Sequence, residues 1–275
     1  MFRALFGGLG LHKPVAIRSV FAHHHRATPP EPWLPRSDRE RYVRVGFSGE
    51  PESLDPGDFD LNLVMAPDDA PTNVVSFLSF AANAHEFGLW PSFAGRAGRG
   101  AGEQFCVAVV SNPRGAERQR FLSRLHQRRG IDSCGRWMNT TGFLAPRDET
   151  AFGDRSLPFL GRYRFMVCFE NTARSYYLTE KLATAYVAGC VPVYWGAPEA
   201  LGWLNPEAFL WLPDTSDGEM DALIERVLAL DSDPAAYQRL RAAPLLVGPV
   251  PPLMRLPVMR EKIEATLRRS RPDAF

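Results

Sequence analysis

The chain has 275 residues, of which 45% are apolar and 23% are charged, so it is long enough for two domains and has the material for a real core. The formal net charge is +1, so no bulk field attracts nucleic acid or a membrane surface. The composition therefore argues against a nucleic-acid partner, and any anion site must be local.

The amino-terminal stretch favours neither a membrane anchor nor a well-formed signal peptide. Lys13, Pro14 and Arg18 interrupt its apolar residues, and no run approaches the ~18 apolar residues of a membrane span. The four cysteines are widely spaced without a C-x-x-C pair, which favours buried thiols in a reducing compartment. The sequence also leaves open a disulfide between two of them. We expect a cytoplasmic protein without a transmembrane anchor.

Residues 1–102 show little regular pattern. A proline-rich connector covers residues 26–36, and an alternating strand from Tyr42 to Phe47 ends at a Ser-Gly-Glu-Pro turn. A second short strand covers residues 60–67, and the glycine-rich residues 93–104 are the best candidate for a domain boundary. We expect residues 1–102 to form a shortened, irregular domain.

From residue 103 onward, predicted strands alternate with predicted helices. Strands are expected at 104–113, 163–171, 191–196 and 208–212, and helices at 115–130, 179–189 and 217–230. This alternation predicts a parallel, doubly wound α/β sheet, in which ligands bind where strands end and helices begin. We expect a nucleotide-binding domain over 103–245, followed by a proline-rich segment and a helix over 246–275.

Lys181 lies at the start of one predicted helix, in a chain with only three lysines. Thr179 is the predicted N-cap, so that Glu180 and Lys181 take the first helical positions. A lysine in the first turn is unfavourable unless an anion binds there, because the helix dipole repels it. Helix amides and an ammonium together favour a phosphate site. A solvated surface lysine is an equally weighted alternative.

Arg118 occupies a similar place in "VSNPRGAERQRF", near the start of the helix that follows a buried strand. An arginine there can bind a diphosphate bidentately. The alternative is again a solvated side chain, because Arg114, Arg118, Arg120 and Arg124 are neighbours and most of them must face water.

Four stretches together resemble a known family: "SNPRGAERQRF", "DSCGRWMNTTG", "YRFMVCFENTARSYYLTEKLATAYVAGCVPVYWGAP" and "NPEAFL". They look like the donor domain of the α1,3/4-fucosyltransferases, glycosyltransferase family 10, in its bacterial members. The resemblance extends from about Val107 to Leu212. Before this region it is limited to the short stretch "VGFSGEP". It implies an α/β fold of GT-B type, with two Rossmann-like domains facing across a cleft: a shortened acceptor-side domain over 1–102 and a donor-binding domain for the nucleotide sugar over 103–245. It also implies inverting transfer of L-fucose from GDP-fucose to a hydroxyl of an oligosaccharide or glycan acceptor.

The resemblance also implies a donor site. By motif, Glu180 is directed toward the fucose or ribose hydroxyls, and Lys181 and Arg118 toward the diphosphate. Asn171 and Tyr177 line the nucleotide pocket.

Glu50, preceded by Gly49, falls at the position of the family's proposed general base. Inversion needs one carboxylate to take the acceptor proton, and it needs stabilisation of the departing diphosphate. Two cations and a helix terminus can supply that stabilisation, so we expect no cofactor and no metal requirement. The acidic residues at 58–60 are interpreted as solvated loop, and the histidines at 23–25 lack zinc-site spacing.

Two other functions stay open from the sequence. One is a related GT-B transferase that uses another nucleotide sugar. The other is an inactive remnant that binds a nucleotide or a sugar.

Overall fold

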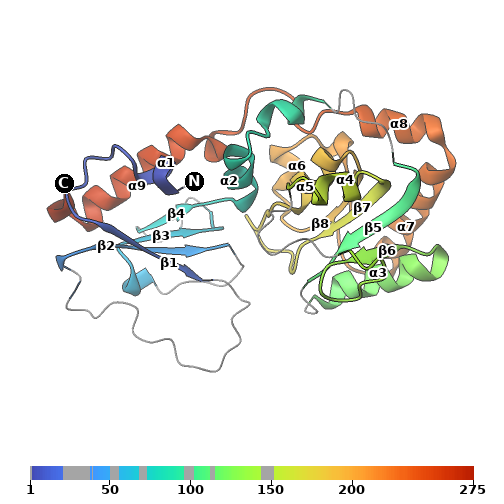
Figure 1. Cartoon of the computed structure of the whole chain (residues 1–275), viewed down its shortest axis with the longest axis horizontal. Helices are drawn as coiled ribbons and strands as arrows, with labels where there is room; N and C mark the ends of the chain where they lie inside the picture. Colours follow the sequence, from blue (N-terminus) through green and yellow to red (C-terminus); the bar gives the residue numbers. More distant parts are fainter. Residues whose placement is uncertain are drawn as a thin grey trace. The chain divides into compact units, whose positions relative to one another are not determined.

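Figure 1 shows the computed structural model of the chain, which describes residues 2–20, 38, 40–49, 56–67, 73–95, 102–111, 115–143 and 152–275. The chain divides into two compact units. The first comprises Met1–Glu86, Ser175–Tyr177 and Val250–Phe275, and the second comprises Phe87–Arg174 and Leu178–Pro249. Each unit is built around its own parallel sheet, which confirms the predicted α/β class.

The described part of the first unit contains a four-stranded parallel sheet. Its strands lie in sequence order: β1 (Val15–Val20), β2 (Val43–Ser48), β3 (Leu61–Val64) and β4 (Val74–Ser76). The described helices of this unit are α1 (Phe2–Phe6), η2 (Pro56–Asp58), α2 (Ser79–Glu86), η5 (Pro252–Met254), α9 (Leu256–Ser270) and η6 (Pro272–Ala274).

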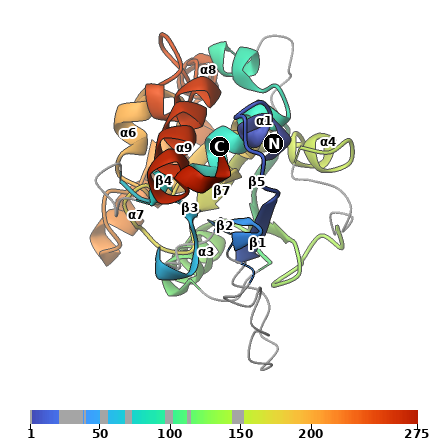
Figure 2. The ribbon, with the colours of Figure 1, turned by 90° about the vertical axis from the view of Figure 1, so that its left-hand side faces the viewer.

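Helix α9 covers one face of this sheet (Figures 1 and 2). Its residues Met259, Ile263 and Leu267 recur every four positions, which places them along one stripe of the helix. They pack with Val45 and Leu63 in one buried apolar cluster. The carboxyl-terminal helix is therefore part of the core of the first unit.

This arrangement differs from the sequence expectation in two respects. The described residues before Phe87 form a regular sheet, whereas the pattern predicts an irregular domain up to residue 102. The segment 246–275, expected as a separate carboxyl-terminal piece, joins the first unit from Val250. Strand β4 has only three residues, too few to show an alternating pattern, and it is stabilised by pairing with β3.

The described part of the second unit contains a five-stranded parallel sheet in the order β6-β5-β7-β8-β9. Its strands are β5 (Gln104–Val109), β6 (Asp132–Cys134), β7 (Tyr163–Phe169), β8 (Val191–Trp195) and β9 (Leu210–Trp211). The described helices are η3 (Trp90–Ala94), α3 (Ala116–Arg128), α4 (Ser156–Leu160), α5 (Lys181–Ala188), α6 (Ala200–Trp203), η4 (Pro206–Ala208), α7 (Asp217–Ser232) and α8 (Pro234–Ala242). The predicted alternation of strands and helices is confirmed.

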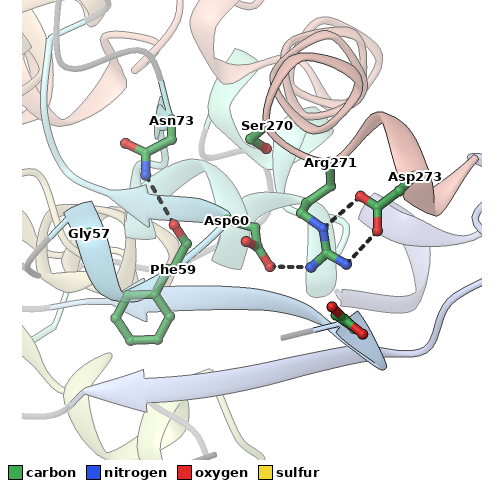
Figure 3. A pocket seen from close by; sticks show the side chains of 8 residues that line it. Gly57, Phe59, Asp60, Asn73, Ser270, Arg271 and Asp273 are labelled. Carbon is green, nitrogen blue, oxygen red and sulfur yellow. Dashed lines mark hydrogen bonds and ion pairs between the residues drawn. The ribbon is translucent and has the colours of Figure 1, made fainter. Parts of the chain in front are cut away.

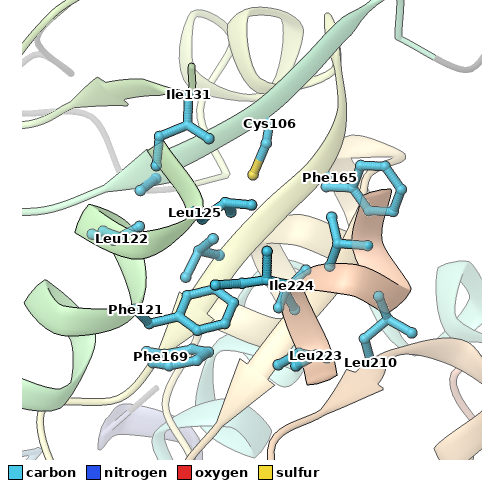
Figure 4. Packing of buried hydrophobic residues seen from close by; sticks show 14 of the residues in the cluster. Cys106, Phe121, Leu122, Leu125, Ile131, Phe165, Phe169, Leu210, Leu223 and Ile224 are labelled. Atoms are coloured by element: carbon cyan, nitrogen blue, oxygen red, sulfur yellow. The ribbon is translucent and has the colours of Figure 1, made fainter. Parts of the chain in front are cut away.

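One face of this sheet packs against α3 and α7 (Figure 4). Phe121 of α3 lies on Phe169 of β7 with ring centroids 4.6 Å apart, and Leu223 and Ile224 of α7 belong to the same cluster. Helix α5 contacts β7 and β8, and Met166, Cys168, Pro192 and Tyr194, which alternate with the cluster residues, are buried as well. Both faces of the sheet are thus covered along β7 and β8, which explains their continuously apolar sequence.

Helices α3 and α7 are joined by ion pairs at a spacing of four residues on both helices. Arg120 and Arg124 each lie within 2.7 Å of Asp217, and Arg124 also pairs with Asp221 at 2.7 Å. Arg128 continues this ladder with Glu225. Arg120 and Arg124 are thus partly exposed but paired, rather than simply solvated as the sequence suggests.

The predicted burial of the cysteines is confirmed, since Cys106, Cys134, Cys168 and Cys190 are all buried and none of these four forms a disulfide. In the part of the chain that the structure describes, no helix combines the length and the apolar character needed to cross a membrane.

Candidate active site

The strand order of the second unit determines where a ligand can bind. In the order β6-β5-β7-β8-β9, the chain leaves β5 toward one edge of the sheet and leaves β7 toward the other. The connections therefore separate at the carboxyl ends of β5 and β7, and such a switch point opens a crevice in doubly wound sheets. Arg118 follows β5, and Asn171 and Lys181 follow β7.

Arg118 is only 4% exposed although it carries a guanidinium. Its Nη1 donates a hydrogen bond of 2.8 Å to Oδ1 of Asn171. Gly115, the N-cap of α3, has a φ of 111°, and a Cβ there would lie 3.3 Å from Nη2 of Arg118. Glycine thus allows both the left-handed turn and the close approach of the guanidinium.

Lys181 lies in a compact polar cluster with Glu170 and Thr179. Its Nζ donates to Oε2 of Glu170 at 2.9 Å and to Oγ1 of Thr179 at 2.8 Å. The backbone amide of Thr179 donates to Oε1 of Glu170 at 2.9 Å. Glu170 is 0% exposed, whereas the side chain of Lys181 keeps 23% of its surface in contact with solvent.

The charges of this cluster depend on one another. Burial raises the pKa of Glu170, and the ammonium of Lys181 opposes that rise. Burial by itself lowers the pKa of Lys181, but the carboxylates of Glu170 and Glu180 outweigh it, so that this pKa lies above its ordinary value. The positive charge of Arg118 also acts on Lys181. Lys181 is therefore charged at neutral pH and lies within electrostatic range of Arg118.

Thr179 does not cap helix α5, contrary to the sequence expectation. The N-cap is Glu180, in helical conformation and without a side-chain capping bond, and Lys181 is the first helical residue. The hydroxyl of Thr179 lies 2.9 and 2.8 Å from the two oxygens of Glu170. This hydroxyl donates to Glu170 and its oxygen accepts from Nζ of Lys181, whereas a capping hydroxyl would accept from a free amide of the first helical turn.

Gly196 follows β8 and lies against the same cluster. A Cβ at this position would lie 2.6 Å from Cγ of Glu170 and 2.4 Å from the hydroxyl oxygen of Tyr194. The amide of Glu170 donates to the carbonyl of Trp195 at 2.9 Å. The ends of β7 and β8 thus hold Glu170 closely, and a glycine is needed for that contact.

The structure brings four of the seven predicted site residues together: Arg118, Asn171, Glu180 and Lys181. Oε1 of Glu180 lies 3.9 Å from Nζ of Lys181. Tyr177 is buried and is assigned to the first unit, as is the half-buried Gly49 directly after β2. Glu50 lies outside the described residues, as do the histidines at 23–25.

Sequence reasoning missed Glu170, which is central to the cluster. A signal was present in "FMVCFEN", where this glutamate ends an otherwise apolar strand. A charged residue next to a fully buried strand is costly unless it is paired, so its position alone pointed to a cation nearby.

The first unit contains a cavity of about 450 Å³ (Figure 3). Arg271 lies in its wall between Asp60 and Asp273, at 2.9 Å from a carboxylate oxygen of each. Asp60 is therefore a buried ion-pair partner and not part of a solvated loop, as the sequence suggested. The cavity lies where β3 and β4 begin, whereas ligands of parallel sheets bind where strands end, so we assign it no part in the chemistry.

A doubly wound sheet with two cationic side chains at its switch point defines an α/β domain of the nucleotide-binding class. Comparison with known proteins gives the family. The family model described as "Glycosyltransferase family 10 (fucosyltransferase) C-term" matches residues 101–241, just over half of the chain. The chain belongs to glycosyltransferase family 10, as its motifs suggest.

Individual relatives agree with this assignment. The chain is 31% identical over 133 residues to an α-(1,3)-fucosyltransferase, FucT, of Helicobacter pylori, covering 48% of this chain and 26% of the relative. It is 32% identical over 117 residues to a GDP-fucose protein O-fucosyltransferase 3 of Danio rerio, covering 41% of this chain and 25% of the relative. The chain thus spans about a quarter of the length of these curated relatives.

Solved structures of α1,3-fucosyltransferases share the fold. One with GDP-fucose has a TM-score of 0.67 at 20% identity, and the match covers 82% of this chain and 75% of the chain in that structure. Another, with GDP, has a TM-score of 0.68 at 17% identity, and the match covers 98% of this chain and 97% of the chain in that structure. The fold is therefore of the GT-B type with Rossmann-like domains, as expected from the motifs.

Proposed function

We propose that this protein is an inverting glycosyltransferase that moves L-fucose from GDP-fucose to a hydroxyl of a glycan acceptor. One observation carries the proposal: at the switch point of the second sheet, Arg118 bonds to Asn171 and Lys181 bonds to Glu170, which are adjacent residues after β7. Family membership indicates fucose as the sugar, and the printed names of relatives and structures include GDP-fucose.

In this proposal, the ammonium of Lys181 and the guanidinium of Arg118 neutralise the charge that develops on the departing GDP. Charge stabilisation by groups already in place is usually the largest single contribution to such catalysis. GDP is a good leaving group, so no general acid is needed. Asn171 orients Arg118, and Glu180 lies at the helix start, where it can accept hydrogen bonds from sugar hydroxyls.

Glu50 is proposed as the general base that takes the proton of the attacking hydroxyl. It comes two residues after the carboxyl end of β2, and strand ends are where catalytic side chains of parallel sheets gather. Gly49 and Tyr177 are proposed to take part in the same reaction. We further propose that the reaction needs no metal ion, because two fixed cations and a helix terminus supply the positive charge. Action on protein-linked glycans and a cytoplasmic location are also proposed.

The test is mass spectrometry of a glycan acceptor array incubated with the protein and GDP-fucose. A gain of one deoxyhexose on any glycan would support the proposal. Consumption of a different nucleotide sugar, with GDP-fucose intact, would support a related transferase instead. Thermal stabilisation by GDP without transfer to any acceptor would indicate a binding remnant. Since one relative is named a protein O-fucosyltransferase, unglycosylated peptides are included as a separate arm.

A further inference from the structure

Glu170 is a buried carboxylate that the proposed donor site does not explain. It is 0% exposed, lies directly after β7 and bonds to Lys181, one of the two cations assigned to a diphosphate. A negative charge next to an anion site weakens anion binding, and burying it is costly. A carboxylate at this place therefore calls for a function other than binding the donor.

The hydrogen bonds around Glu170 show what it does to Lys181. One proton of the ammonium goes to Oε2 of Glu170 at 2.9 Å, and a second goes to Oγ1 of Thr179 at 2.8 Å. The hydroxyl of Thr179 in turn donates to Glu170 at 2.8 to 2.9 Å. An ammonium has three protons, and these two bonds determine the direction of the third.

Glu170 itself is held firmly. It accepts the backbone amide of Thr179 at 2.9 Å, and its own amide donates to Trp195. Gly196 lies so close to Cγ of Glu170 that there is no room for even one additional carbon atom. The carboxylate is thus fixed from the end of β7, from the start of α5 and from the end of β8.

We propose that Glu170 is a positioning residue, which holds the ammonium of Lys181 in place so that its third proton faces the diphosphate of the donor. This inference rests on the proposed function. A lysine side chain has four flexible carbon–carbon bonds, and ordering it only when the donor arrives would cost free energy at that moment. Glu170 and Thr179 order it beforehand, at the expense of one compensating negative charge. Glu170 acts on the reaction only through Lys181.

The scarcity of lysine gives a direct measurement. The chain has only Lys13, Lys181 and Lys262, so protein labelled with ¹⁵N-lysine gives three ammonium signals in NMR spectra. Lys181→Met and Lys262→Met assign them. We expect the Lys181 signal to show restricted motion and slow exchange with water, and to shift when GDP is added. In Glu170→Gln its motion and its exchange with water should both increase relative to the parent.

The second measurement is a double-mutant cycle, in which the rate of GDP release from GDP-fucose is determined for each variant. Glu170→Gln is expected to lower kcat by roughly tenfold to a hundredfold, the scale of a misplaced catalytic group. In the Lys181→Met background the same substitution should change kcat by less than about twofold, because its target is gone. If the two effects multiply, or if Lys181 moves no more in Glu170→Gln than in the parent, the positioning role is wrong.

A variant with a smaller change covers the case in which Glu170→Gln does not fold. Thr179→Val removes the bridging hydroxyl and keeps the side-chain shape, so it should mobilise Lys181, and Thr179→Ser should restore its order. Unchanged mobility in folded Thr179→Val would overturn the role of this bridge. Failure of the proposed function is recognised separately: the parent would then transfer no fucose from GDP-fucose to any acceptor, while the ammonium signal would still report whether Glu170 orders Lys181.

Discussion

The guanidinium of Arg118 donates a hydrogen bond of 2.8 Å to the side-chain oxygen of Asn171, 53 positions further along the chain. This bond joins the start of α3 to the end of β7, which are the two sides of the switch point. Because Asn171 follows Glu170, the same strand end contacts both cations of the proposed donor site. The two cations are therefore held by adjacent residues of one strand end.

The bidentate geometry of Arg118 leads to the first prediction. Arg118→Lys keeps the charge but cannot bond to Asn171 and to a diphosphate in the same plane. GDP affinity measured by calorimetry should fall by roughly tenfold to a hundredfold, which corresponds to the loss of a hydrogen bond between charged groups. Arg120→Lys, on the same helix but in the ladder with α7, is the control and should bind GDP like the parent. Equal affinity in both variants would remove Arg118 from the site.

Glu50→Gln tests the proposed general base. The substitution should leave GDP affinity unchanged, because the carboxylate acts on the acceptor and not on the nucleotide. Transfer should fall by roughly a hundredfold or more, the usual scale for a lost base. Measuring GDP binding and fucose transfer on the same preparation separates the two effects. Turnover equal to that of the parent would exclude Glu50 from the mechanism.

Metal independence of the reaction is the third prediction. Enzyme treated with EDTA and freed of divalent ions should keep its transfer rate, because Lys181 and Arg118 supply the positive charge for the leaving group. The measurement is the initial rate of GDP release with EDTA and then with added manganese. Complete loss of transfer that manganese restores would contradict the prediction.

Gly196 should not tolerate a side chain. In Gly196→Ala the new methyl group would lie 2.4 Å from the Tyr194 hydroxyl and 2.6 Å from Cγ of Glu170. We expect the free energy of unfolding to fall by about 1 to 3 kcal/mol, the range for an overpacked core, in urea titrations followed by circular dichroism. Gly202→Ala is a matched control, because its Cβ would meet no atom within 4 Å. A midpoint for Gly196→Ala as high as that of the control would contradict the close packing.

The ladder between α3 and α7 should make stability depend on pH and salt. The hydrogen bond from Arg120, followed by the charge of Arg124, lowers the pKa of Asp217 below its ordinary value of 3.8. A lowered pKa means that the ionised form stabilises the fold above that ordinary value, and that this contribution is lost as the pH falls through the lower, folded-state pKa.

The corresponding variant is Asp217→Asn, compared with Glu219→Gln in the same first turn of α7. Thermal unfolding at pH 6 and low salt should show a lower midpoint for Asp217→Asn than for Glu219→Gln. The difference should shrink at 1 M salt, where the Debye length is about 3 Å, and in strong acid. A difference that persists unchanged under both conditions would mean that the ladder does not act through charge.

Much of the second unit can be predicted from its sequence. The apolar runs that became β7 and β8, and residues 106–108 of β5, are buried almost throughout, and helix α3 has a clear apolar stripe, so local pattern and final structure agree. The motif around Lys181 was equally readable, since a family resemblance depends on residues in order along the chain. In the first unit, β1 and β4 were not recognised, because short strands depend on pairing partners that are distant in sequence.

The sequence by itself determined the α/β class and the family, and it predicts Arg118 and Lys181 as the two cations, because these depend on the order and spacing of residues. Only the tertiary structure decided that Glu170 is the partner of Lys181, that Asn171 is the partner of Arg118, and that the carboxyl-terminal helix packs on the first sheet. These contacts join residues far apart along the chain, or side chains whose direction depends on the local fold. A hydrogen bond acts only over about 3 Å, so no pattern in the sequence can specify which donor reaches which acceptor.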